Sequence, residues 1–228
     1  MTIPPESSPS VDQNWASGRP RSPQGRRAPE RTREQILQAA IREFADKGLG
    51  GARVDAIAAR AGANKRMLYH YFGSKADLFL AVLERVYDDI RRAETDLHLE
   101  ALDPVAAMRK LVEFSFGYFL ANPHFIPLLN SENLHRARHL KRSKRIREMH
   151  SPLVAMISSM LERGRDSGAF RRDVDPVQLY VSIAALGYFY FSNIHTLSTI
   201  FGRDLSAPRR IAERKRHAAD MVLGYLRP

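Results

Sequence analysis

Apolar residues recur at intervals of three and four along most of the chain, which is the period of amphipathic helices. In the N-terminal part this pattern predicts four helices, over residues 31–47, 54–61, 65–72 and 74–94. Five more are predicted over residues 104–120, 125–139, 143–166, 177–200 and 208–226. No run alternates with the period of a strand. The pattern therefore predicts an all-α fold of about nine helices.

Local signals mark where the first four helices begin and end. Thr32, Asn64 and Ser74 each precede an apolar helical run and are suited to accept a hydrogen bond from its first turn. Gly48 and Gly62 follow helices as stops. These boundaries suggest a small domain over 31–78, of the size of a helix-turn-helix domain, a linking helix over 74–94 and a larger helical domain over 95–228.

The first 30 residues differ from the rest because they are rich in proline and serine and have no apolar period. We expect 1–30 to be a disordered arm. Its arginines at 19, 21, 26 and 27 suit a DNA minor groove, as basic arms do. A solvated tail without a role is the simpler interpretation, because no motif accompanies these residues.

Charge and composition narrow the classes of function. The chain has 228 residues with 36 Lys and Arg against 25 Asp and Glu, a net charge of +11 and a pI near 10.2. Such a balance favours a polyanionic partner, usually a nucleic acid. The absence of cysteine excludes disulfides and thiolate chemistry. No nucleophile elbow, H-E-x-x-H or Gly-rich phosphate loop is present, so we expect no enzyme activity, no cofactor and no metal.

The second and third predicted helices are joined by the short turn Ala61-Gly62-Ala63-Asn64. Gly62 can adopt positive φ, and the small neighbour Ala58 lets the two helices approach closely and cross steeply. Such a pair has helix-turn-helix geometry, in which the second helix enters the DNA major groove.

The residues around this turn carry a family resemblance. The run Ile57-Ala58-x-x-Ala61-Gly62-x-Asn64-Lys65-x-x-Leu68-Tyr69-His70-Tyr71-Phe72-x-Ser74-Lys75-x-Asp77-Leu78 resembles the signature of the tetracycline-repressor (TetR) family. Ile36, Ala40, Phe44 and Lys47-Gly48 match the first helix of that family. The motif covers residues 31–85. It implies a cytoplasmic, dimeric repressor that a small-molecule effector releases from a palindromic operator.

Physical reasoning assigns the expected DNA contacts. Leu68 and Phe72 should face the core, while basic, hydroxyl-bearing and amide side chains at helix starts and on the third helix face base edges or phosphates. The expected contact residues are Thr32, Arg33, Arg53, Asn64, Lys65, Arg66, Met67, Tyr69, His70, Tyr71, Ser74 and Lys75.

Two positions depart from the family pattern. The family usually has Thr or Ser directly before the second helix, where this chain has Ala52-Arg53, so a capping hydroxyl is missing and Arg53 is free for a phosphate. The family often has Gly and Thr where Arg66 and Met67 stand. These side chains suit guanine and a thymine methyl, so we expect a different operator sequence.

The segment 177–201 is apolar nearly all round and has no charged residue. Its length would span a bilayer, but its polar residues, including Asn193 and His195, make a lone span costly. A helix of this kind in a soluble protein is buried on several sides. We therefore expect 177–201 and 208–226 to pair with a second copy, and the resemblance implies the same homodimer.

The middle helices suggest an effector pocket. Its expected lining is Phe114, Tyr118, Met156, Met160 and Tyr188, although ordinary core packing explains these residues as well. This apolar and aromatic set suggests a hydrophobic or aromatic effector, with an arginine to meet an acidic group.

A basic stretch over 135–147 has seven Lys and Arg residues. His135 and His139 are four residues apart, the spacing of two metal ligands on one helix face, and Glu132 lies one turn earlier. The simplest interpretation of the basic stretch is a solvated loop, and a site for an anionic ligand or a surface for acidic groups of a partner subunit are the alternatives. Two unrelated surface histidines explain His135 and His139 more simply than a metal site does.

Overall fold

The computed structural model describes residues 23–228, with side chains described from Pro29 onward, and this part of the chain is all-helical. The α-helices are α1 (Pro23–Gly51), α2 (Val54–Arg60), α3 (Lys65–Phe72), α4 (Lys75–Thr95), α5 (Pro104–Ala121), α6 (Phe125–Leu134), α7 (Lys144–Asp166), α8 (Pro176–Ser192), α9 (Ile194–Phe201) and α10 (Pro208–Leu226). Short 3₁₀ turns occupy Leu99–Ala101 and Leu140–Arg142.

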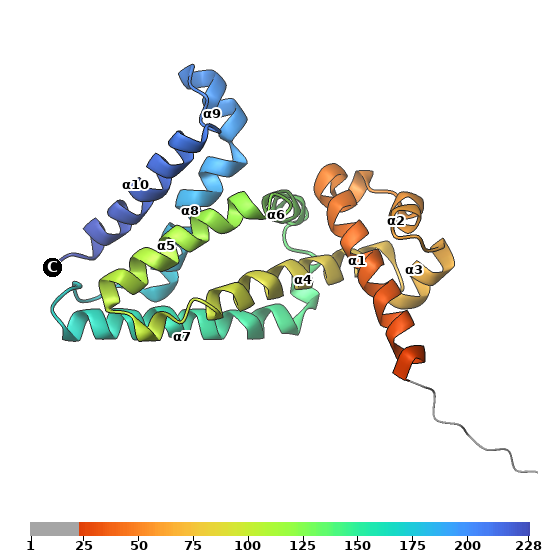
Figure 1. The fold of residues 1–228 in the computed structure, drawn as a ribbon, viewed down its shortest axis with the longest axis horizontal. Helices are drawn as coiled ribbons and strands as arrows, with labels where there is room; N and C mark the ends of the chain where they lie inside the picture. The colour runs from red at the N-terminus through yellow and green to blue at the C-terminus, as the bar shows by residue number, and fades with distance from the viewer. Residues whose placement is uncertain (1–22) are drawn as a thin grey trace, which may run out of the picture.

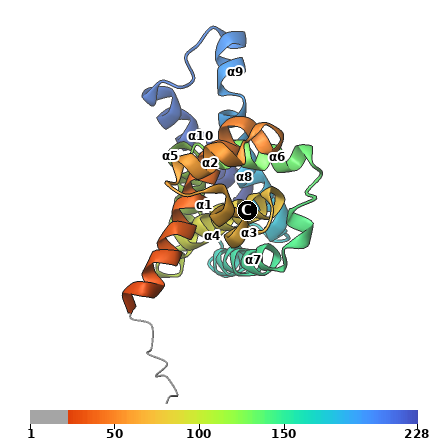
Figure 2. The same ribbon diagram turned by 90° about the vertical axis from the view of Figure 1, so that its right-hand side faces the viewer.

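The helices form two packed regions that α4 connects (Figure 1). The small region is built from α1, α2, α3 and the start of α4, and α6 packs against α1. The larger region packs α5 against α8 and α10, with α7 along α4 and α5. Figure 2 looks at the molecule from the side of the small region, with α2 and α3 in front.

There are two apolar cores, and the first extends from the small region along α4 to α6, the end of α5 and the start of α7. The first core contains Phe44, Ile57, Leu68 and Phe79, all fully buried. The second core contains Met108, Leu111, Ile157 and other apolar side chains of α5, α7, α8 and α10. The all-α prediction and the division into a small N-terminal helix-turn-helix part and a larger helical part are confirmed.

Most of the predicted caps in the N-terminal region are present. The Asn64 side chain accepts a 2.9 Å hydrogen bond from the Met67 backbone, and the Ser74 hydroxyl accepts one of 3.1 Å from the Asp77 backbone. Gly48 and Gly62 take φ values of +64° and +62°, a region that glycine enters without a Cβ penalty. Gly48 kinks α1, which continues to Gly51 and does not stop at Gly48 as predicted, and Gly62 turns the chain between α2 and α3.

The start of the first helix was predicted wrongly. Helix α1 begins at Pro23, so Thr32 lies inside the helix and is not its N-cap, and residues 23–30 of the expected disordered arm are helical. Proline suits the first turn of a helix because its missing N–H would have no partner there. The apolar face begins only at Ile36, so the apolar pattern could not reveal these first turns. Residues 1–22, including Arg19 and Arg21, lie outside the described part of the chain, as do the side chains of Arg26 and Arg27.

The long apolar helix expected over 177–200 is two helices. The chain breaks at Asn193, whose φ of −118° and ψ of 11° end α8, and α9 begins at Ile194. The Asn193 amide donates to the Phe189 carbonyl at 2.9 Å, which satisfies a carbonyl at the end of α8. This break makes ten α-helices within residues 23–228, where about nine were expected. None of these helices has the length and apolarity needed to cross a bilayer.

The helix expected over 125–139 is also too long, because α6 ends at Leu134. Arg136 and Ala137 have φ values of +54° and +58°, which a helix cannot accommodate. The buried carboxylate of Glu132 explains this turn. It accepts hydrogen bonds from the backbone N–H groups of His139 at 2.7 Å and Leu140 at 2.9 Å, and so folds the chain back on α6.

Candidate DNA-binding face and ligand cavity

The third helix presents two different faces. Leu68 and Phe72 are buried, as expected, and hold α3 against α1 and α4. On the other side Lys65, Arg66, Tyr69 and His70 are exposed, and 41% of the Tyr69 surface is accessible. Basic side chains and a phenol are therefore exposed on α3, which lies in front in Figure 2.

Other expected contact residues on α3 are partly occupied by the protein itself. Lys65 forms an exposed 3.1 Å ion pair with Asp55 of α2. Tyr71 and Met67 are half-buried, and Tyr71 packs against the first core. The Asn64 side chain is engaged in capping α3. Asn64 and Tyr71 therefore have structural roles, Met67 is half-buried, and Lys65, Arg66, Tyr69 and His70 are the accessible set.

The remaining expected residues flank α3. The exposed Arg33 of α1 has its guanidinium 5.0 Å from the centre of the Phe72 ring, at the end of α3. Arg53 is the N-cap residue of α2, and its side chain makes no capping hydrogen bond. Lys75 begins α4 and reaches the Gly50 carbonyl at 3.4 Å. Thr32 is half-buried within α1. Exposed cations therefore stand on several sides of α3.

A buried carboxylate that the sequence did not reveal holds this region together. Glu43 of α1 is 1% exposed and accepts hydrogen bonds from Lys47 Nζ at 2.8 Å and the Arg53 backbone at 3.3 Å. Arg60 of α2 approaches within 3.7 Å. The hydrogen bond from Lys47 lowers the pKa of Glu43 despite its burial. Its charge thus ties the end of α1 to both ends of α2.

The basic stretch 135–147 is held along α4 by ion pairs and a hydrogen bond. Arg142 pairs with Asp77 at 2.5 Å and Arg145 with Asp88 at 3.3 Å, both on α4. Ser143 Oγ donates to Glu84 of α4 at 2.6 Å. Hydrogen bonds from the Ser74 hydroxyl and then from Arg142 lower the pKa of Asp77. Some of the stretch's charge is therefore compensated within the chain.

The histidines of this stretch do not form a metal site. His139 is buried, and its Nδ1 lies 2.7 Å from Glu132, whose carboxylate is already committed to the turn. His135 is exposed in the turn and is no longer on a shared helix face. Across residues 23–228 no group of three or more His, Asp and Glu side chains is placed to hold a metal ion.

The five expected pocket residues are not brought together into one cavity. Phe114, Tyr118 and Tyr188 pack against the first core, where the Phe114 and Tyr118 rings are 5.7 Å apart. The Tyr188 hydroxyl donates to the Asn130 amide oxygen. Met160 is buried in the second core. Only Met156 among the five lines the cavity described next.

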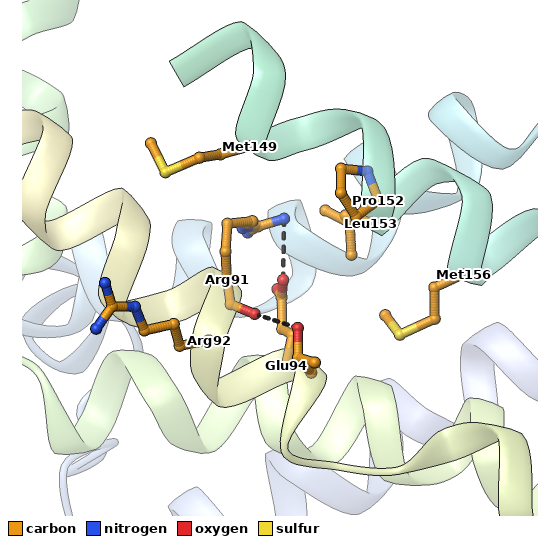
Figure 3. A pocket seen from close by; sticks show the side chains of 8 residues that line it. Arg91, Arg92, Glu94, Met149, Pro152, Leu153 and Met156 are labelled. Atoms are coloured by element: carbon orange, nitrogen blue, oxygen red, sulfur yellow. Dashed lines mark hydrogen bonds and ion pairs between the residues drawn. The ribbon is translucent and has the colours of Figure 1, made fainter. Parts of the chain in front are cut away.

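A cavity of about 210 Å³ lies between α4 and α7 (Figure 3). One wall is apolar and comes from Met149, Pro152, Leu153 and Met156 of α7, and the other comes from the last turns of α4. The α4 wall carries Arg91, Arg92, Glu94 and Thr95. The cavity thus combines an apolar side with a charged one, as ligand sites do.

The charged side contains a buried pair. Arg91 and Glu94 are 8% and 3% exposed, and Arg91 Nη1 lies 3.0 Å from Glu94 Oε2. This ion pair lacks hydrogen-bond geometry, so Arg91 Nε and Nη1 and Glu94 Oε2 are buried without a hydrogen-bond partner. Arg91 Nη2 donates to the Tyr180 hydroxyl at 3.2 Å. Burial raises the pKa of Glu94 to about 7, although Arg91 opposes the shift.

The outer face formed by α8 and α10 is apolar. Val177, Val181 and Phe189 of α8 and Met221 and Tyr225 of α10 are each about half exposed. A hollow of about 380 Å³ runs between the two helices at this face. Large exposed apolar patches of this kind mark contact surfaces.

Comparison with known proteins agrees with this architecture. Residues 36–82 match the family described as bacterial regulatory proteins, tetR family, and residues 104–222 match the tetracyclin repressor-like C-terminal domain. The chain is 39% identical over 198 residues to the HTH-type transcriptional repressor NicS of Pseudomonas putida, which covers 87% of this chain and 93% of that protein. It is 34% identical over 139 residues to the HTH-type transcriptional repressor SCO4008 of Streptomyces coelicolor, covering 60% of this chain and 69% of that protein.

A solved structure of a transcriptional regulator has a similar fold. The crystal structure of the putative transcriptional regulator SCO4942 from Streptomyces coelicolor superposes with a TM-score of 0.65 at 25% identity, covering 86% of this chain and 99% of that one. The family consists of transcription regulators, which agrees with the prediction that the chain is not an enzyme. The chain belongs to the TetR family and is a DNA-binding transcriptional repressor of that family.

Proposed function

We propose that the chain acts in the cytoplasm as a homodimer, binds a palindromic operator through α3 and its flanks, and is released when a small molecule occupies the cavity between α4 and α7. The observation that carries this proposal is the position of α4. The same helix has Lys75 beside the outer face at one end and Arg91 and Glu94 in the cavity at the other.

The homodimer is supported by the α8 and α10 face. Five half-exposed apolar side chains on two adjacent helices would be costly to leave in water. A second copy placed across a two-fold axis buries the same patch on both subunits. It also sets two α3 helices side by side, as a palindrome requires.

Dimerisation is tested by placing a charge in the face. Val181→Glu should give monomers in analytical ultracentrifugation, because Val181 is one of the half-exposed apolar residues of α8 and a charge there would be buried by a second copy. Leu134→Glu is the matched control, because Leu134 is 84% exposed and lies outside this face. A Val181→Glu protein that stayed dimeric would place the interface elsewhere.

DNA contact is assigned to residues of α3 and of its flanks. Arg66 and Met67 lie at the start of α3 for base readout, Tyr69 follows on the same helix, and Lys75, Arg33 and Arg53 flank it for phosphates. Lys65, His70, Tyr71, Ser74, Asn64 and Thr32 complete the proposed surface, with Asn64 and Ser74 acting also through the caps that orient α3 and α4.

Sequence-specific binding is tested by selecting bound sequences from random duplex DNA and measuring affinity by fluorescence anisotropy with excess competitor. A palindrome should emerge and should be retained at tenfold competitor. The main alternative is a non-specific nucleic-acid binder, which would yield no consensus and would lose binding to competitor in proportion to its concentration.

Release by a ligand is tested through the spacing of the two α3 helices. The natural chain has no cysteine, so Arg66→Cys gives a single labelling site per subunit. A ligand lowers DNA affinity only by favouring a spacing that DNA disfavours, so double electron–electron resonance should show a longer distance when DNA is released. An identical distance distribution in both states would contradict movement through α4.

A further inference from the structure

The floor of the α4–α7 cavity is a guanidinium with unused donors. Arg91 Nε and Nη1 have no hydrogen-bond partner although the side chain is 8% exposed, and they lie beside the cavity with Glu94 (Figure 3). Buried N–H groups without partners are costly, about 1–3 kcal/mol each. Nε–H and Nη1 lie on different edges of the guanidinium, so a ligand carboxylate would meet either of them through a single charge-assisted hydrogen bond.

The other wall defines the body of the ligand. Met149, Pro152, Leu153 and Met156 provide only apolar atoms and a flexible thioether surface. The volume of about 210 Å³ exceeds the roughly 150 Å³ of a cavity that holds benzene in another protein. One six-membered ring with a carboxylate therefore fits.

Resting on the proposed function, which makes this cavity the effector site, we propose that the effector is a small organic acid bound as its anion to Arg91, and that Glu94 takes up a proton when it binds. The proton comes from solvent, and no covalent bond changes. The free site is held by the Arg91–Glu94 pair, and the bound site by the ligand carboxylate on Arg91 beside a neutral Glu94.

Charge balance requires this proton. In the free cavity Arg91 is matched by Glu94, and the nearby cation Arg92 is exposed and pairs with Asp88 at 2.5 Å. An incoming anion would put two carboxylates on one buried guanidinium, and two close carboxylates cannot both stay ionised at low cost. Glu94 is the group suited to become neutral, because burial already raises its pKa to about 7.

The other titratable groups near this pair, on α4 and on the helices packed against it, do not replace Glu94. Tyr118 of α5 and Tyr87 of α4 have pKa values raised to about 12, so both stay neutral near pH 7. Tyr180 of α8 accepts the hydrogen bond from Arg91. His150 of α7 has a pKa lowered by burial, and its Nδ1 lies 2.7 Å from the Ile146 carbonyl. Near neutral pH, Glu94 is therefore the proton acceptor among them.

The experiment compares matched acids and amides on the intact protein without DNA. Benzoate and benzamide have the same ring and nearly the same size, and cyclohexanecarboxylate with its amide is a second pair. Isothermal titration calorimetry in two buffers of different ionisation enthalpy gives the affinity and the number of protons taken up. We expect each acid to bind at least about tenfold more tightly than its amide, the effect of a charge-assisted pair.

The pH profile separates the proton from simple attraction. The acids stay ionised between about pH 5.5 and pH 8.5, so any pH dependence in this range comes from the protein. Their affinity should not change with pH below the pKa of Glu94 and should fall about tenfold per pH unit above it. Proton uptake should rise from near zero to about one per site over the same range. An amide control should show neither trend.

Two variants assign the roles. Glu94→Gln copies the neutral carboxyl, so it should retain acid binding and abolish both proton uptake and the pH dependence. Arg91→Met should lose the preference for acids over amides, and Arg91→Met/Glu94→Gln gives the same readout without leaving an unpaired buried carboxylate. Circular dichroism confirms that each variant is folded.

Each outcome decides a separate point. Equal binding of acids and amides, or no binding of any acid, would overturn the assignment of an organic acid to Arg91. Acid binding without proton uptake, or with uptake unchanged in Glu94→Gln, would overturn the role of Glu94. Operator binding and release are measured apart from these titrations, so a failure of the proposed repressor function would show there and not in the ligand profile.

Discussion

Two buried glutamates, one in each region, show how differently the two parts of this protein use charge. Glu43 in the DNA-binding region and Glu94 in the cavity are 1% and 3% exposed. Glu43 accepts hydrogen bonds from Lys47 and from the Arg53 backbone, and its pKa is lowered. Glu94 has a single ion-pair partner, and its pKa is raised to about 7. The two shifts have different leading causes: the hydrogen bond from Lys47 lowers the pKa of Glu43, whereas burial raises the pKa of Glu94 against the attraction of Arg91.

This difference corresponds to a difference in role. A carboxylate supplied with donors is a fixed structural charge, as the junction of α1 and α2 requires. Both carboxylates have one buried oxygen without a hydrogen-bond partner, but only Glu94 lines a cavity, where we propose that it takes up a proton when a ligand binds. Rigidity in the small region and adjustability in the large one are what a ligand-controlled DNA-binding protein needs.

The largest expected effect is on the free energy of unfolding, to which Glu94 and Glu43 should contribute with opposite dependence on pH. Glu94 binds its proton more tightly when folded, so its contribution to stability is complete below its ordinary pKa of 4.5 and is lost as the pH rises to about 7. The change is about 3 kcal/mol. Glu43 has the opposite sign: its contribution is present above pH 4.5 and is lost as the pH falls through its lowered pKa.

Urea unfolding of Glu94→Gln and Glu43→Gln against pH tests both signs. Relative to the natural chain, Glu94→Gln should flatten the profile between about pH 4.5 and 7, and Glu43→Gln should flatten it below about pH 4.5. Each variant is the control for the other. Profiles that stayed parallel to that of the natural chain would show that burial does not perturb these carboxyls as described.

The same comparison explains what the sequence could predict. Asn64, Ser74 and Gly62 act on neighbouring residues, so local pattern was enough to place the caps and turns around α3. Leu68 and Phe72 were predicted inward for the same reason. The caps and turns of this region depend on chemistry within four residues.

The cavity depends instead on tertiary packing. Arg91 and Glu94 stand in a charged run that reads as a solvated helix face, and they are buried only because α7 and α8 cover the end of α4. Phe114, Tyr118 and Tyr188 were expected in a pocket because they are aromatic, yet aromatic composition does not distinguish a lining from a core. The break at Asn193 and the turn at Arg136 likewise depend on contacts that no periodicity contains.

Replacing a glycine in each region should have an intermediate effect on stability, with a different physical cause in each. A Cβ on Gly164 of α7 would lie 1.9 Å from the Phe170 ring, whereas a Cβ on Gly62 would meet nothing within 4 Å. Gly164→Ala should cost about 1–3 kcal/mol through overpacking. Gly62→Ala should cost about 1–2 kcal/mol through its positive φ alone.

Asparagine substitutions distinguish these two causes. Asparagine tolerates positive φ better than alanine but is larger, so Gly62→Asn should be milder than Gly62→Ala, and Gly164→Asn should be worse than Gly164→Ala. Denaturant midpoints of the four variants give the order. The same order at both positions would mean that one cause acts in both regions.

The smallest effect concerns the missing cap of α2. Arg53 has the extended backbone of an N-cap, with φ −114° and ψ 125°, but its side chain makes no capping bond. Arg53→Ser should therefore stabilise the fold by about 0.5–1 kcal/mol. If Arg53 is kept for a phosphate, the same variant should bind operator more weakly, with a salt slope reduced by about one counterion.

Arg53→Ala separates the two contributions, because it removes the cation without adding a hydroxyl. It should share the reduced salt slope of Arg53→Ser and lack the gain in unfolding free energy. An unchanged slope in both variants would remove Arg53 from the DNA surface. An equal stability of both would show that α2 gains nothing from a cap there, since Glu43 already accepts the hydrogen bond of the Arg53 backbone and holds the start of the helix.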